Sequence, residues 1–249
     1  MSQGSRRPIE LALALSSEPT DRTRLSALLS TSTRDLVALT AANELDAAGQ
    51  LGAVDRWRVG KTLYRHALYE RAIPIFESLD DVHHRQIPRW EVAYLRGRCA
   101  FRRGRWDAAE AWYRTAISRT SSGERRAELE VHLGRTHELA GEMDDAVAAA
   151  QRAVRFKTTD DRRLFLARLR LRRAEPELAQ AGLARMRSRT ARSRGVFMVG
   201  LFEMVRGDAA SARSELAKVS RKPWRGPAAV LAAELALAAE DPVGALALL

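Results

Sequence analysis

A small residue recurs on a fixed schedule through most of the chain, and this repeat constrains the fold more than any other feature. The first three positions are spaced 37 residues apart and the later ones 33 apart: Gly60, Gly97, Gly134, Ala167, Gly200 and Ala233. An alanine stands twelve residues after each of them: Ala72, Ala109, Ala146, Ala179, Ala212 and Ala245. Apolar residues follow at sixteen residues in every repeat, the last of them Leu249.

These spacings predict pairs of helices. Offsets of twelve, sixteen and nineteen differ by four and three, so the residues stack on one face of a helix. The small reference residue lies on an earlier helix, where a large side chain would hold the two helices apart. Each repeat is therefore expected to be a helix, a tight turn and a second helix.

Turn-forming residues fall where this scheme needs them. Gly104, Gly141 and Gly207 each follow their reference position by seven residues, where a left-handed cap is expected to end the first helix. Pro176 and Pro242 stand where the second helix of the fourth and sixth repeats should begin, and proline suits a first helical turn.

The second repeat carries the most detailed pattern: Trp90, Leu95, Gly97, Gly104, Trp106, Ala109, Tyr113 and Ala116. This pattern resembles the tetratricopeptide repeat, and the resemblance covers about residues 53–249. It implies an all-α fold, an α-solenoid of helix pairs wound as a right-handed superhelix. We expect an N-terminal helical segment over residues 1–50 and six tetratricopeptide-like helix pairs over residues 51–249.

The sixth repeat stops at Leu249 inside its second helix, and residues 245–249 are all apolar. A solenoid needs a polar cap over its last apolar face. The C-terminus is thus expected to be uncapped. We interpret the chain as the front part of a longer protein, and coverage by another chain is the alternative.

A candidate binding groove follows from the tetratricopeptide resemblance, since first helices line the concave surface in that family. The residue after each reference position should face this groove: Lys61, Arg98, Arg135 and Arg168, then Leu201 and Glu234. Four successive cations would attract an acidic peptide or another anionic polymer. The competing interpretation is that abundant arginine fills exposed helix positions by chance.

The net charge of +11 allows two interpretations. Only four of the 42 basic residues are lysines, which is typical of a GC-rich gene. Binding of RNA or another polyanion is the functional alternative, and the densest clusters are residues 162–173 and 185–194. Because no nucleic-acid-binding motif accompanies the charge, we favour the compositional interpretation.

Motifs for chemistry are weak. Gly60-Lys61-Thr62 lacks the first glycine of a phosphate loop, since Asp55 stands there. His132 and His137 have no third metal ligand in sight. The single cysteine, Cys99, excludes an internal disulfide. No apolar run approaches the roughly 20 residues of a membrane helix. The sequence therefore predicts no catalytic residue, metal or cofactor.

A narrower resemblance concerns residues 57–64, 69–76 and 192–216. They are similar to the helical units of soluble lytic transglycosylases, in which a ring of helix pairs precedes a domain that cleaves peptidoglycan. Glu77-Ser78 matches the family's Glu-Ser pair, but no Gly-Leu-Met-Gln stretch follows, so no catalytic role is carried over to Glu77. The resemblance implies a peptidoglycan partner, a periplasmic or cell-envelope location, and an enzyme as the longer parent protein.

The sequence thus predicts a non-catalytic repeat scaffold, the superhelical part of a lytic transglycosylase-type protein. Two alternatives stay open. One is a stand-alone tetratricopeptide adaptor, in the cytoplasm, that binds an acidic peptide in the basic groove. The other is polyanion or RNA binding through the arginine-rich surface. Arg6-Arg7 before the short apolar stretch 9–15 indicates an amphipathic first helix rather than an export signal.

Overall fold

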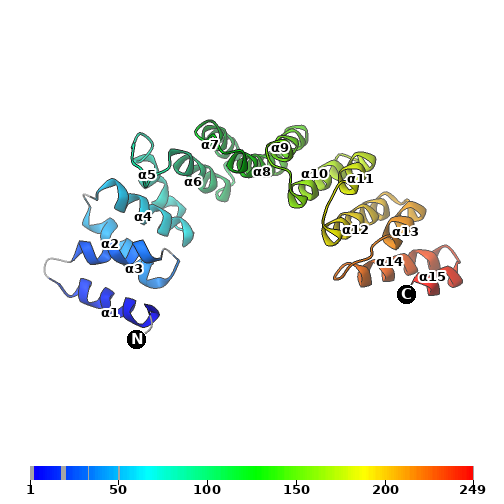
Figure 1. Ribbon diagram of the computed structural model, residues 1–249, viewed down its shortest axis with the longest axis horizontal. Coiled ribbons are helices and arrows are strands. Elements are labelled where there is room, and N and C mark those ends of the chain that lie inside the picture. Colours follow the sequence, from blue (N-terminus) through cyan, green and yellow to red (C-terminus); the bar gives the residue numbers. More distant parts are fainter. Residues whose placement is uncertain (1–2, 18–20, 33, 50, 249) are drawn as a thin grey trace. The chain divides into compact units, whose positions relative to one another are not determined.

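The computed structural model describes residues 3–17, 21–32, 34–49 and 51–248, and these residues form helices and loops without a β-strand (Figure 1). The fold is therefore all-α, as predicted. The chain divides into two compact units, a first unit of residues 1–121 and a second unit of residues 122–249.

The first unit begins with three helices and continues with two helix pairs. Its helices are α1 (Gln3–Leu15), α2 (Arg22–Thr31), α3 (Leu36–Ala48), α4 (Ala53–Arg65), α5 (Tyr69–Glu77), α6 (Arg89–Arg102) and α7 (Trp106–Ser118). Helix α3 packs against both α2 and α4. The domain boundary expected after residue 50 stays a prediction.

The second unit consists of four helix pairs. Its helices are α8 (Gly123–Ala140), α9 (Met143–Phe156), α10 (Asp160–Arg172), α11 (Pro176–Ala184), α12 (Arg189–Arg206), α13 (Ala209–Ala217), α14 (Arg225–Ala238) and α15 (Pro242–Leu248). As predicted, Pro176 and Pro242 begin α11 and α15. Each pair packs along its length, and successive pairs of the unit contact one another.

The scheduled small residues are buried between helices. All six reference residues lie on first helices and are buried, as are the six alanines twelve residues later. A Cβ atom at Gly97 would lie 2.8 Å from the ring of Tyr113, and one at Gly200 would lie 2.7 Å from Leu216 Cγ. These contacts confirm the predicted close approach. Leu249, at the same offset in the last repeat, lies outside the described residues.

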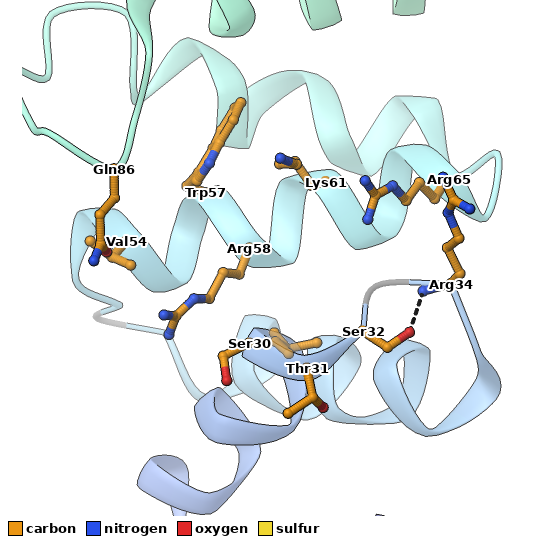
Figure 2. Close-up of a pocket in the computed structure, with 11 residues that line it drawn as sticks. Ser30, Thr31, Ser32, Arg34, Val54, Trp57, Arg58, Lys61, Arg65 and Gln86 are labelled. Carbon is orange, nitrogen blue, oxygen red and sulfur yellow. Dashed lines mark hydrogen bonds between the residues drawn. The ribbon is translucent and has the colours of Figure 1, made fainter. Parts of the chain in front are cut away.

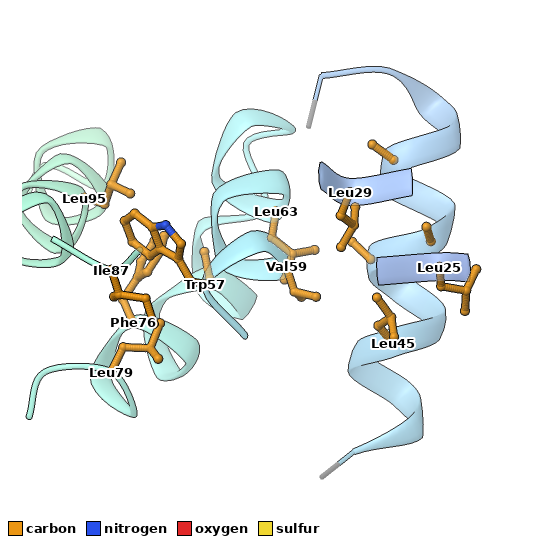
Figure 3. Packing of buried hydrophobic residues seen from close by; sticks show 14 of the residues in the cluster. Leu25, Leu29, Leu45, Trp57, Val59, Leu63, Phe76, Leu79, Ile87 and Leu95 are labelled. Atoms are coloured by element: carbon orange, nitrogen blue, oxygen red, sulfur yellow. The ribbon is translucent and has the colours of Figure 1, made fainter. Parts of the chain in front are cut away.

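The core of the first unit is continuous from its opening helices into the helix pairs (Figure 3). Val59 and Leu63 of α4 face the buried leucines of α2 and α3. Trp57 extends toward α5 and meets Phe76 edge to face, with ring centroids 5.9 Å apart. Helix α4 thus joins both groups of helices through opposite faces.

The left-handed turn recurs in every pair, although the sequence indicated it in only three. The glycines have φ values of +70°, +86° and +82° at Gly104, Gly141 and Gly207. The same position in the other three pairs has φ values of +61°, +58° and +58° at Ala67, Ala174 and Glu240. The pair geometry therefore imposes this conformation even where the residue type disfavours it.

Helix α1 covers the stretch weighed above as an export signal. No helix in the described part of the chain combines the length and the apolar character needed to cross a bilayer.

Candidate functional site

The four predicted groove cations lie on the first helices of their pairs, and each stands over an aromatic ring. The ring centroids lie 4.8, 5.8, 5.9 and 5.4 Å from the charged groups in the contacts Lys61–Trp57, Arg98–Tyr94, Arg135–Phe165 and Arg168–Phe165. Such contacts stabilise a cation by about 0.5–1 kcal/mol at exposed sites. These aromatic partners were not predicted from the sequence.

Lys61 and Arg98, in the first unit, both have intramolecular partners. Lys61 Nζ lies 3.1 Å from a carboxylate oxygen of Glu91, and both side chains are only a quarter exposed. Arg98 is half-buried, and its Nη1 donates a hydrogen bond of 3.2 Å to the hydroxyl of Tyr94. A ligand would have to compete with these contacts.

A cavity of about 570 Å³ adjoins Lys61 between the end of α2 and helix α4 (Figure 2). Its basic lining residues are Arg34, Arg58, Lys61 and Arg65, and none of its lining residues is acidic. Burial, and next the charge of Arg34, lower the pKa of the Arg65 guanidinium. Arg58 is held by Asp55 at 3.3 Å. The cavity is basic, but half of its cations are already engaged.

Arg135 and Arg168, in the second unit, line one cavity of about 590 Å³ together with Arg194. These residues come from α8, α10 and α12. The apolar lining consists of Leu164, Phe165 and Met198, and Asp161 is its acidic residue. We call this site the arginine cavity. It combines three guanidinium groups with an apolar wall.

The three arginines of this cavity are not equally available. Arg168 is held by the buried carboxylate of Glu138 at 2.6 Å, and Arg172 also binds that carboxylate. Arg135 and Arg194 are exposed, and neither forms an ion pair or hydrogen bond within the described residues. Each guanidinium group stands over an aromatic ring instead. For Arg194 this is the ring of Trp224, whose centroid lies 5.8 Å from the guanidinium carbon. Two cations can therefore meet a ligand.

Arg194 was not predicted as a site residue, because it does not stand directly after a reference residue. In its repeat that position is Leu201, which does not line the cavity. The repeat itself contains the missing signal. Asp161 and Arg194 both stand six residues before a small reference residue and both line the cavity.

The weaker motifs have structural surroundings. Gly60-Lys61-Thr62 lies inside α4 rather than in a loop. His137 is buried, with Nδ1 2.6 Å from the Glu142 carboxylate. Glu77 lies on the surface, 3.3 Å from Arg96. Cys99 is fully buried, and burial raises the pKa of its thiol to about 12. A thiol held neutral in this way is a poor nucleophile.

Fold and sequence comparisons agree on the class of protein. The chain is a tetratricopeptide-like helical solenoid, and a tetratricopeptide repeat family model matches residues 60–125. This match begins in α4 and covers all of α5, α6 and α7. No curated protein sequence matches the chain significantly.

Solved structures that resemble the chain include a repeat protein. The C-terminal part of a tetratricopeptide repeat-containing protein from Cytophaga hutchinsonii is 15% identical with a TM-score of 0.73, covering 91% of this chain and 92% of that one. A MamA crystal structure is 17% identical with a TM-score of 0.51, covering 63% and 89%. A MamA fragment from Desulfovibrio magneticus RS-1 is 14% identical, also with a TM-score of 0.51, covering 64% and 92%. At these identities the likeness is one of fold.

Proposed function

We propose that the protein is a non-catalytic interaction scaffold that holds an acidic segment of a partner protein. The observation that carries this proposal is the arginine cavity, where Arg135, Arg168 and Arg194 surround an apolar wall. Helical repeat proteins use such extended surfaces to hold other molecules. This corresponds to the stand-alone adaptor weighed above.

The chemistry of the cavity favours a peptide that is acidic and partly apolar. Guanidinium groups bind carboxylates through two parallel hydrogen bonds. An apolar side chain of the ligand would pack on Leu164, Phe165 and Met198. Asp161, the acidic lining residue, would repel a carboxylate beside it and so restrict where the acids of the ligand can bind.

Lys61 and Arg98, in the first unit, are proposed to contribute less to the binding of an acidic segment. Each is held by a neighbour of its own, Glu91 for Lys61 and Tyr94 for Arg98. Binding an acidic ligand there would exchange one partner for another. We therefore assign most of the binding energy to Arg135 and Arg194.

The lytic transglycosylase interpretation stays a prediction without further support. Neither the matching family model nor any structure named above is a lytic transglycosylase. We therefore favour a protein or peptide partner over peptidoglycan.

The proposal is tested by titrating a labelled peptide into the protein. The probe is a short peptide in which one leucine is flanked by glutamates, and its lysine-flanked counterpart serves as the ligand control. The variant Arg135→Gln/Arg194→Gln should bind the acidic peptide about a hundredfold or more weakly, since hydrogen bonds to charged groups contribute about 1.5–3 kcal/mol each.

The protein control is Arg102→Gln/Arg105→Gln, which removes the same charge from two exposed arginines at the turn between α6 and α7. It should bind like the parent protein. An equal loss in both variants would mean that only net charge matters. Equal binding of the two peptides would also overturn the proposal.

A further inference from the structure

Two acid-free segments of the second unit form a separate basic surface. Residues 185–192 lead from α11 into α12, and residues 218–225 lead from α13 into α14. Their basic residues are Arg185, Arg187, Arg189, Arg192, Lys218, Arg221, Lys222 and Arg225. We call this surface the basic edge. The segments stand one 33-residue repeat apart, so they occupy equivalent places in successive helix pairs.

The two segments meet in the structure. A cavity of about 350 Å³ is lined by Arg189, Arg192, Lys218 and Arg221, together with Ser193, Ser220 and Val196. The hydroxyl oxygens of Ser193 and Ser220 lie 3.5 Å apart across the contact. None of the lining residues is acidic. Folding therefore gathers like charges that repel one another.

Ion pairs are sparse on this surface, as they are for Arg135 and Arg194 of the arginine cavity. Elsewhere in the unit, arginines pair with acids at 2.9 Å in the contacts Arg152–Glu130 and Arg213–Asp241. Within the described residues, one side chain of the basic edge forms an ion pair: Lys218 Nζ lies 2.6 Å from a carboxylate oxygen of Glu215. The other seven basic side chains of the edge form no ion pair within those residues.

Asp160 of the preceding pair lies beside this surface, and its charge interacts with that of Arg187. Asp160 accepts hydrogen bonds of 3.2 and 2.7 Å from the backbone N–H groups of Arg187 and Ser188. Its carboxylate also lies 3.7 Å from Arg163, outside the edge. These backbone hydrogen bonds, first that of Ser188, lower the pKa of Asp160. Its role is to fix the loop that carries the edge arginines.

We propose that the basic edge binds the phosphate backbone of a nucleic acid strand. Arginine forks match phosphate oxygens bidentately, and the exposed hydroxyl of Ser220 adds a hydrogen-bond donor. Releasing counterions from phosphates supplies much of the free energy of such complexes. A membrane surface fits less well, because Met186 and Val219, the large aliphatic residues of the two segments, are 2% and 5% exposed and cannot insert. The ring of Trp224 packs on Phe197, with ring centroids 5.5 Å apart.

This site is independent of the proposed peptide site. It contains none of the residues of the arginine cavity, so each can fail without the other. An edge variant should keep its affinity for the acidic peptide. The arginine-cavity variant should keep most of its affinity for nucleic acid.

The test measures fluorescence anisotropy of a labelled, unstructured oligouridylate against the full chain over a salt series. The variant Arg189→Gln/Arg192→Gln/Arg221→Gln should bind about tenfold or more weakly at low salt. Each single-strand phosphate contact contributes about −0.7 to the slope of log K against log salt. The slope should therefore become less steep by about 2 in this variant.

The matched control, Arg102→Gln/Arg105→Gln/Arg155→Gln, removes the same charge from exposed arginines outside the edge, and it should bind within about twofold of the parent protein. Equal weakening of both triple variants would overturn the proposal, as would no binding by the parent protein at low salt. Tighter binding to anionic lipid vesicles than to the oligonucleotide would overturn it too. Circular dichroism checks folding, and Arg221→Gln alone provides a milder variant with a smaller loss in the same direction.

Discussion

Gly97 and Tyr113 illustrate how one residue sets the spacing of a helix pair. The ring of Tyr113 is fully buried and occupies the space that a side chain on residue 97 would need. The pair can approach closely only because that side chain is absent. The same arrangement recurs at Gly60 with Phe76 and at Gly200 with Leu216.

Gly97→Ala should destabilise the protein by about 1–3 kcal/mol, because the added methyl group overpacks a contact 2.8 Å from the Tyr113 ring. Gly182→Ala is the matched control, since its Cβ would meet nothing closer than Arg170 Nη1 at 3.9 Å. The control should stabilise by about 0.5–1 kcal/mol through helix propensity. Denaturant unfolding measures both, and equal effects would contradict the packing account.

The buried thiol of Cys99 should make the folded protein less stable at high pH. Its pKa is raised by burial from an ordinary value of 9.0 to about 12, so only the unfolded chain ionises between those values. This contribution is intact below about pH 9 and falls by up to about 1.4 kcal/mol per pH unit above it. Relative to Cys99→Ala, the parent protein should lose stability more steeply from pH 9 to 10. Parallel pH profiles would refute this.

At the scale of elements, the turn between paired helices adopts a left-handed backbone conformation even where its residue is not glycine. Ala174 adopts a φ of +58° at the position where Gly141 has +86°. A left-handed conformation costs a residue with a Cβ about 1–2 kcal/mol. The turn survives because the two packed helices fix its ends.

Ala174→Gly should therefore stabilise the protein by about 0.5–1 kcal/mol, and Gly141→Ala should destabilise it by about 1 kcal/mol. No atom lies within 4 Å of a Cβ at residue 141, so strain in the backbone alone causes the second effect. Thermal unfolding of both variants checks the opposite signs. If both variants shifted the unfolding temperature in the same direction, the left-handed conformation of the turn residue would not be the cause.

Ion pairs join successive elements of the first unit. Asp80, after α5, lies 2.6 Å from Arg119 at the end of α7 and 3.7 Å from Arg96 of α6. The hydrogen bond from Arg119 is the main cause that lowers the pKa of Asp80, and burial opposes it. The ionised carboxylate is thus favoured in the folded protein.

Asp80→Asn should cost about 1 kcal/mol at neutral pH. Because the folded pKa lies below the unfolded value of 3.8, this contribution is present above about pH 4 and is lost as pH falls further. The stability difference from the parent protein should therefore shrink at about pH 3. The exposed neighbour substitution Asp81→Asn is the control and should have little effect at either pH. A difference that persists at low pH would exclude the ion pair as its cause.

Much of the architecture was predictable from sequence because packing repeats with the chain. Spacing alone predicted three features: the small reference residues, the alanines twelve residues after them, and three of the six turns. Ala67, Ala174 and Glu240 escaped because their conformation is imposed by the helices around them. Propensity cannot reveal a conformation that tertiary packing imposes.

The candidate sites were less predictable because their electrostatics join distant residues. Arg168 is engaged by Glu138, thirty residues earlier, and nothing in the local sequence signals that contact. Arg185–Arg194 was visible as a cluster, yet its significance appears only when residues 218–225 lie beside it without acids. Composition shows that charge is present, and the fold determines which charges are neutralised.

At the scale of the whole molecule, the second unit carries two basic sites of different character. The arginine cavity has an apolar wall, and the basic edge has hydroxyl groups and no acid in its lining. This difference is the physical basis for proposing a peptide at one site and a phosphate chain at the other. The central claim is that the first site selects an acidic protein segment by contact with particular arginines.

Nuclear magnetic resonance of the arginine side chains tests that claim most directly. Isotope-labelled arginine gives one Nε–H signal per side chain, and the acidic peptide is added stepwise. The account predicts saturable changes at Arg135, Arg168 and Arg194, with Arg189 and Arg221 unmoved. Changes centred on Arg189 and Arg221, or small changes spread over all exposed arginines, would contradict it.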